Sequence, residues 1–184
     1  MLNRVVAAVC VMILAGLIAA APARADDALI ERLLNELAQP DNRTWRRTER
    51  EIVTAWSRSG SAAMDLLLQR GRDALREGQT NDAIEHLTAL TDHAPDFAEG
   101  WNVRATAYFN AGLYGQSIAD IARTLTLNPH HFGALSGLGA IFEELGQDEQ
   151  ALAAYRAALA IHPHLERIKQ AATRLEAKVA GQQL

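Results

Sequence analysis

Three prolines recur at an interval of 34 residues, and three glycines precede them at the same interval. The prolines are Pro95, Pro129 and Pro163, and the glycines are Gly78, Gly112 and Gly146. A period of this length is typical of a solenoid of helix-turn-helix units, because one unit is too small to bury its own apolar face and has to stack on its neighbours. The period therefore indicates an all-α array with a binding surface, and not a fold built around an active site.

Large and small residues keep the same register. The first helix of each unit carries the large or apolar residues Leu67, Trp101, Leu135, then Ala74, Tyr108, Phe142, with the small residues Gly71, Ala105, Gly139 between them. The second helix carries Ala83, Ser117, Ala151, followed by Leu87, Ile121, Tyr155. Small residues let the two helices of a unit approach closely. Each proline ends a second helix, because it has no N–H to donate.

These residues resemble the tetratricopeptide repeat (TPR) family over residues 64–165, and the third unit matches best. The resemblance implies a solenoid of antiparallel helix pairs in a right-handed superhelix, with units at 64–97, 98–131 and 132–165. Arg70 and Arg104 depart from the pattern, since they stand where the third unit has Leu138. We expect their stems to cover apolar surface while their guanidinium groups reach water.

Helical patterns flank the repeats on both sides. Residues 26–63 predict a helical pair, with apolar stripes at Ile30, Leu33, Leu34, Leu37 and at Trp45, Ile52, Val53, Trp56. This pair is interpreted as a degenerate repeat that caps the array, although Glu49 stands where a small residue belongs. Residues 166–184 predict a C-terminal capping helix and tail, with one apolar face at Ile168, Ala171, Ala172, Leu175 and Val179.

The first 25 residues have the pattern of a cleavable signal peptide. Arg4 precedes an apolar run, and Ala23-Arg24-Ala25 offers a small-x-small cleavage site. Cleavage would remove Cys10 and two arginines, which takes the net charge from −4 to −6. We therefore expect an acidic periplasmic protein that does not bind nucleic acid. The alternative is a retained inner-membrane anchor, because the apolar run is near the short limit of a bilayer span.

The concave face of such an array is formed by the first helix of each unit, and its exposed stripe is the candidate partner-binding groove. Its residues are Asn102, Thr106, Phe109 and Asn110 in the second unit, Arg72 and Arg76 in the first, and Ser136 and Glu143 in the third. Amides that pair with a peptide backbone, an aromatic contact, and charges from basic to acidic suit a peptide or a partner helix. The alternative is that these residues simply face solvent.

One TPR subtype is excluded by these positions. Chaperone-type TPR domains that grip a C-terminal carboxylate use lysine and asparagine in the first unit and basic residues in the third. This chain has Leu68 and Arg72 in the first unit and Gly133 and Gly137 in the third. The sequence therefore predicts that the carboxylate clamp is absent.

Two further constellations have alternative interpretations. His93, His130, His131, His162 and His164 lie near the ends of successive repeats, where they suit polar turns better than a zinc or copper site. The arginine stripe, defined as Arg43, Arg46, Arg47 and Arg50, forms a basic face that could bind an anionic membrane or envelope surface. Glu49 and Glu51 interrupt it, so a solvated, partly ion-paired face is the simpler interpretation.

Catalytic motifs are missing from the sequence. No phosphate-binding glycine-lysine loop and no His-Glu-x-x-His zinc motif occurs, and no Ser-His-Asp set is indicated by spacing. We expect neither enzyme activity nor a cofactor or metal. The expected function is a protein-protein interaction module or adaptor in the cell envelope, with a surface-associated factor that uses the arginine stripe as the alternative.

Overall fold

The computed structural model describes residues 21–182, and side chains of residues 27–181. This part of the chain consists of nine α-helices: α1 Ala21–Leu37, α2 Trp45–Trp56, α3 Ala62–Arg76, α4 Thr80–His93, α5 Ala98–Asn110, α6 Tyr114–Leu127, α7 Phe132–Glu144, α8 Asp148–Ile161 and α9 Glu166–Gln182. The predicted signal peptide lies mostly outside the described residues, and its cleavage remains a prediction. None of the described helices is both long enough and apolar enough to cross a membrane.

The turn inside each repeat is built by a glycine in the left-handed region. Gly78, Gly112 and Gly146 have φ of 74°, 71° and 68°. In the first repeat the N–H of Gln79 donates to the carbonyl of Ala74 at 2.8 Å, and the N–H of Gly78 donates to Leu75 at 3.2 Å. These two bonds form a Schellman motif that ends α3 and reverses the chain into α4. Glycine recurs every 34 residues because each repeat needs a residue with positive φ at this turn, a conformation that residues with a Cβ atom disfavour.

Small residues let the paired helices touch. A Cβ atom added to Gly71 would lie 2.5 Å from Cγ of Leu87, and one added to Gly139 would lie inside contact distance of the Tyr155 ring. In the second repeat, the hydroxyl of Ser117 donates to the carbonyl of Ala105 at 2.7 Å. Each helix pair therefore packs at a distance that a larger residue would forbid.

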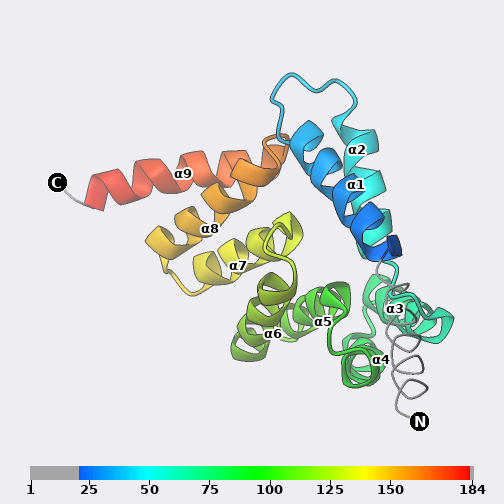
Figure 1. Ribbon diagram of the computed structural model, residues 1–184. Coiled ribbons are helices and arrows are strands. Elements are labelled where there is room, and N and C mark those ends of the chain that lie inside the picture. Colours follow the sequence, from blue (N-terminus) through cyan, green and yellow to red (C-terminus); the bar gives the residue numbers. More distant parts are fainter. Residues whose placement is uncertain (1–20, 183–184) are drawn as a thin grey trace, which may run out of the picture.

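The three pairs α3–α4, α5–α6 and α7–α8 stack into an arc (Figure 1). Successive pairs pack through α4 with α5 and α6 with α7, while α3 also contacts α5 and α5 contacts α7. The first helices therefore line the inner side of the arc. The expected fold class, an all-α helical-repeat solenoid, is confirmed for the described residues.

The predicted C-terminal capping helix α9 packs on α8. Ala171, Ala172 and Leu175 of α9 join Tyr155 and Leu152 in one apolar cluster. At the outer end, the Lys178 ammonium lies 2.7 Å from the buried carboxylate of Asp148. The helix thus covers the last repeat on the side where no further repeat follows.

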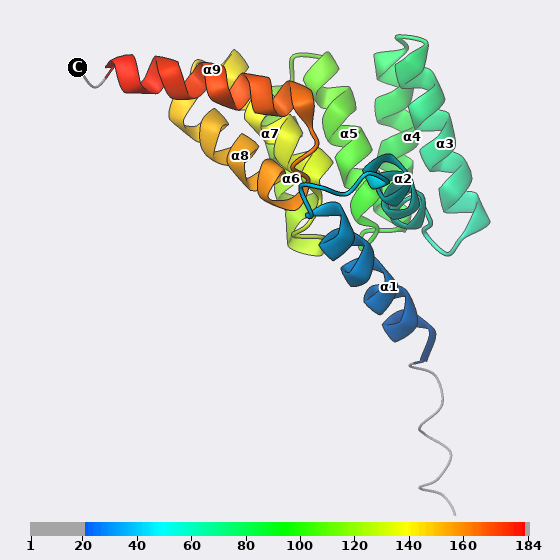
Figure 2. The ribbon, with the colours of Figure 1, turned by 90° about the horizontal axis from the view of Figure 1, so that it is seen from above.

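The N-terminal helical pair departs from the expected degenerate repeat. Helices α1 and α2, called the N-terminal hairpin below, do not continue the stack in front of α3. They lie across the open side of the arc toward the α8–α9 turn, as both views show (Figure 1, Figure 2). Leu37 and Glu49 occupy the hairpin positions equivalent to Gly71 and Ala83, so the two helices cannot approach as closely as a repeat pair does.

The hairpin instead uses its apolar residues on the third repeat. Its cluster contains Leu33, Leu34, Leu37 and Ile52 of the hairpin together with Phe132 of α7, and Ile161 and Leu165 pack against that cluster. His164 at the α8–α9 turn contacts the Gln39 carbonyl at 3.0 Å. The hairpin therefore connects the two ends of the array.

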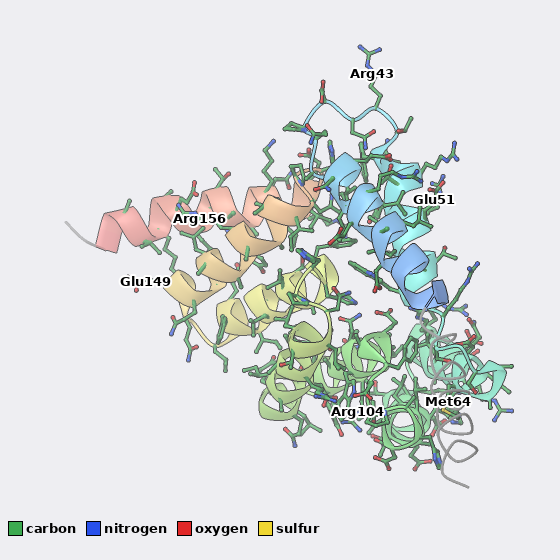
Figure 3. All side chains as sticks on the ribbon, in the orientation of Figure 1. Arg43, Glu51, Met64, Arg104, Glu149 and Arg156 are labelled. Carbon is green, nitrogen blue, oxygen red and sulfur yellow. The ribbon has the colours of Figure 1, made fainter. Side chains whose placement is uncertain are left out.

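Arg104 also differs from the expectation. Its side chain is 11% exposed, and the guanidinium forms two hydrogen bonds to the Asp120 carboxylate of α6, at 2.7 and 2.9 Å, and a third to the Thr91 hydroxyl at 2.7 Å. Burial works against the charged form, but the bonds and the charge of Asp120 outweigh it and raise the pKa of Arg104. The guanidinium of Arg104 (labelled in Figure 3) is held against Asp120 of the neighbouring helix instead of reaching water. Arg70, in contrast, is exposed.

Candidate binding groove

A recess of about 120 Å³ opens between α5 and α7 on the inner side of the arc. Asn102, Thr106 and Phe109 of α5 form one wall. Gly133, Gly137 and Ala140 of α7 face them, and the remaining lining is made by Ala105, Ser117, Ile121, Ala134 and Ile141. The recess is therefore apolar in its depth, with an amide and a hydroxyl at its rim.

The recess exists because α7 carries glycine where other helices carry side chains. A Cβ atom added to Gly137 would meet only Ile121 Cδ1, at an ordinary contact distance of 3.7 Å. The space in front of Gly137 is thus open to a side chain supplied by a partner. A cavity of roughly 150 Å³ accommodates benzene in another protein, so this recess has room for one aliphatic side chain.

The predicted groove residues of α5 are partly brought together. Asn102 donates to the Glu99 carboxylate at 3.1 Å, and the Thr106 hydroxyl donates to the Asn102 carbonyl at 3.2 Å. The Phe109 ring packs against Tyr114 with centroids 5.6 Å apart. Asn110 ends α5, is exposed, and does not line the recess.

The predicted charged residues are already paired within the chain. Arg72 forms an ion pair with Glu99 and donates to the Ser57 hydroxyl at 3.0 Å, and Arg76 pairs with Asp73 on its own helix. Glu143 accepts from the Tyr155 hydroxyl at 3.1 Å and pairs with Arg174 of α9. The expected gradient from basic to acidic is therefore largely neutralised by partners within the chain, which for Arg72 and Glu143 come from other helices.

Ser136, the remaining predicted residue, lies outside the recess. Its hydroxyl donates to the Phe132 carbonyl at 2.8 Å. It lines a second, open cleft of about 590 Å³ between α2, α7 and the start of α9, where Trp45 and Arg46 form the opposite wall. The hairpin therefore stands beside the groove at the N-terminal end of α7.

Comparison with known proteins identifies the repeats. A sequence model of the tetratricopeptide repeat matches residues 68–126 and 103–166, which together make up more than half of the chain. The chain belongs to the tetratricopeptide repeat family. A TPR repeat-containing protein of Rhizobium etli is 39% identical over 131 residues, which are 71% of this chain and 64% of that protein. The match thus spans less than two thirds of the relative's length.

Solved TPR structures have the same fold. The first TPR of Spaghetti (RPAP3), bound to the HSP90 peptide SRMEEVD, superposes with a TM-score of 0.62 at 23% identity, over 65% of this chain and 95% of that one. The TPR2B domain of yeast Sti1, in complex with an Hsp70 peptide, superposes with a TM-score of 0.60 at 18% identity, over 64% and 99%. At these identities the likeness establishes the fold.

Sequence reasoning missed a buried polar network at the edge of the second TPR. Nδ1 of His131 accepts the Ala134 N–H at 3.1 Å, so the ring proton lies on Nε2 and is donated to Glu99 at 2.8 Å. Glu99 also pairs with Arg72 and accepts a hydrogen bond from Asn102. The position of His131 before α7 was visible in the sequence, but nothing there signalled Glu99, which is buried at 6% exposure.

The repeat-end histidines fall into two groups. His131, His162 and His164 all contact aromatic rings of the hairpin, whereas His93 and His130 are exposed. Within residues 27–181, no three histidine, cysteine or acidic side chains converge in a way that would hold a metal ion.

The arginine stripe is divided between two faces of the hairpin. Arg46 lines the cleft toward α7, whereas Arg47 and Arg50 lie beside Leu29 and Leu33 of α1, and Arg47 pairs with Glu51 at 2.7 Å. Arg43 points away from the repeats (Figure 3).

Proposed function

We propose that this TPR protein is a non-enzymatic interaction module that binds a peptide segment of a partner on its inner face. The observation that carries the proposal is the recess between α5 and α7, which is apolar, open, and rimmed by Asn102 and Thr106. An aliphatic side chain of the partner enters the recess, and the Asn102 amide pairs with the partner's backbone. Two TPR neighbours are described in complex with HSP90 and Hsp70 peptides, which supports a peptide as the ligand.

The peptide proposed here is uncharged where it crosses the groove. Arg72 is occupied by Glu99, and the positions facing the recess from α7 are Gly133 and Gly137. A free basic side chain that could hold an acidic or C-terminal carboxylate is therefore missing from the recess lining. We further propose that the module acts in the cell envelope, on the basis of the N-terminal apolar run and cleavage-like site.

Peptide display on the purified protein tests the recess. The decisive variant is Gly137→Leu, whose Cβ meets only Ile121 Cδ1 at an ordinary contact distance and whose side chain points into the recess. The matched control is Gly115→Leu, whose Cβ has nothing within 4 Å. We expect enriched peptides to share one aliphatic residue and to lose roughly ten- to hundredfold in affinity on Gly137→Leu, since burying such a side chain contributes about 1.5–3 kcal/mol. Equal binding to wild type and Gly137→Leu would place the site elsewhere.

A second candidate is association with an anionic envelope surface through the arginine stripe. It is favoured by a furrow of about 460 Å³ in which Arg47, Arg50 and Arg58 stand beside the exposed Leu29. Binding at this face depends on charge, so its affinity should fall steeply between about 50 and 300 mM salt, because added salt shortens the distance over which charges attract. Binding in the recess should change little over the same range, which separates the two candidates.

A further inference from the structure

The N-terminal hairpin is held on the third TPR by ring contacts with histidines. Trp45 stacks on His164, with centroids 5.2 Å apart and planes 1° from parallel, and meets His162 edge-on at 5.6 Å. Trp56 stacks on His131 at 4.8 Å. These five side chains are called the histidine latch below. They join α2 to the edge of an array more than seventy residues away in the chain.

His162 lies at the centre of the latch and has unusual surroundings. Its side chain is fully buried, and neither ring nitrogen has a hydrogen-bond partner. Phe132 meets it edge-on at 5.0 Å, and the nearest carboxylate oxygen, of Glu49, is 3.6 Å from Nε2 and so beyond a good hydrogen bond. Among the described residues, His162 is the one whose side-chain nitrogens are buried without any partner. The neutral ring therefore serves here as an aromatic packing group.

The charged form of His162 is disfavoured while the hairpin is closed. Burial lowers the pKa of His162, whereas the nearby charge of Glu49 on α2 raises it. His164 at the α8–α9 turn, with ring centroids 5.9 Å apart, lowers it further. The contact from α7 is Phe132, which carries no charge. In a detached hairpin the ring would face water and return to its ordinary pKa of about 6.5.

The hairpin covers one end of the inner face. The Ser57 hydroxyl at the end of the hairpin accepts a hydrogen bond from Arg72 at 3.0 Å. Arg72 also pairs with Glu99, which accepts a hydrogen bond from His131. Trp56 packs on Phe132 at the first turn of α7, with centroids 5.2 Å apart. Trp45 stands across the open cleft from Gly133 and Ser136. Detachment would therefore uncover the first turn of α7, where Gly133 lines both the open cleft and the recess.

We propose that the histidine latch is an acid-sensitive closure: proton uptake by His162 releases the hairpin from the third TPR and uncovers that end of the groove. Above pH 6.5 neither state holds the proton, and the closed form keeps its full advantage. Below pH 6.5 the His162 ring binds a proton in the open form but not in the closed form, so the equilibrium constant for opening rises by up to tenfold per pH unit. The consequence for partners rests on the proposed function, whereas the opening itself does not.

Amide hydrogen exchange of the full chain at pH 7.5 and pH 5.0 tests the latch. The variant is His162→Phe, which keeps a ring and removes the titratable group, and the control is His93→Phe at an exposed histidine. Comparison at each pH cancels the intrinsic effect of pH on exchange. At pH 7.5 we expect equal hairpin exchange in all three proteins. At pH 5.0, residues 30–56 of wild type and His93→Phe should exchange at least tenfold faster than those of His162→Phe, with the TPR helices unchanged.

Equal hairpin exchange in wild type and His162→Phe at both pH values would overturn the proposal, and so would a uniform loss of protection over all helices. If His162→Phe does not fold, the exchange of wild type alone decides, after correction for the intrinsic effect of pH. The opening constant of residues 30–56 should rise at least tenfold between pH 7.5 and 5.0 while that of the TPR helices stays constant, and an unchanged constant contradicts the latch. Neither measurement uses a partner, so failure of the latch and failure of peptide binding are distinguishable.

Discussion

At single positions, the array depends on residues small enough for two helices to meet. Gly139 is the clearest case, because a Cβ there would overlap the Tyr155 ring. Gly115, on α6, has nothing within 4 Å of its Cβ position. The same residue type is therefore required at one place and tolerated at the other, and only the facing helix distinguishes them.

Replacing Gly139 with leucine should destabilise the protein by roughly 1–3 kcal/mol or more, since the extra side chain forces α7 and α8 apart. Urea unfolding measures the loss. The matched control, Gly115→Leu, should leave the free energy of unfolding within about 0.5 kcal/mol of wild type. An unchanged unfolding midpoint for Gly139→Leu would show that the register assigned to the third TPR is wrong.

The buried pair of Arg104 and Asp120 gives a second prediction at this scale. Arg104→Met leaves the Asp120 carboxylate, which is 7% exposed, without its partner, and should cost about 3–5 kcal/mol. Adding Asp120→Leu removes the unpaired charge and should recover much of the loss. A double variant no more stable than the single one in urea unfolding would contradict this account. Arg70→Met, at an exposed position, serves as the neutral control.

At the scale of the helix, each element is stable because a neighbour covers its apolar face. Helix α9 covers Tyr155 and Leu152 of α8, and Lys178 neutralises Asp148 at the start of that helix. Without α9, the last TPR would present this face to water. An array whose units stabilise one another is expected to fray from such an end.

Truncation after Leu165 should therefore lower the unfolding midpoint and remove protection from amide exchange in α7 and α8 before α3 and α4. The control truncation, after Val179, retains Leu175 and Lys178 and should behave like the full chain. Equal protection of α8 in both truncated proteins would mean that α9 is not the cap.

At the scale of the whole molecule, stability against unfolding should depend on pH in the alkaline range. On the alkaline side, burial and the neighbouring Glu143 raise the pKa of Tyr155 to about 12. In the unfolded chain the value is about 10. Between pH 10 and 12 the unfolded chain releases a proton that the folded chain keeps, so stability present below pH 10 is lost as pH rises, by up to about 1.4 kcal/mol per unit.

Tyr155→Phe isolates this effect. Below pH 10 the variant should be less stable than wild type by about 1 kcal/mol, because it lacks the hydrogen bond to Glu143. Its deficit should shrink at pH 11, since phenylalanine cannot ionise. Urea unfolding of both proteins at pH 9, 10 and 11 measures the difference. Parallel stability curves over that range would show that Tyr155 does not titrate with folding.

The groove illustrates how far sequence reasoning reached. Asn102, Thr106 and Phe109 were placed on one face because residues four and seven apart share a side of a helix, and all three line the recess. The pairing of Glu143 with Arg174 and of Arg72 with Glu99 was not predicted. Those partners come from other helices, and their distance depends on how tightly the array curves.

The sequence by itself determined the repeat class of this protein, because a 34-residue period of glycines, prolines and small residues describes contacts between neighbouring helices. Only the tertiary structure decided where the hairpin docks. His164 meets the Gln39 carbonyl across 125 residues, and Trp45 and Trp56 find their histidines only once three TPRs have curved toward them. Periodicity records interactions between near neighbours in the chain, whereas closure of the arc is the accumulated result of every helix packing along it.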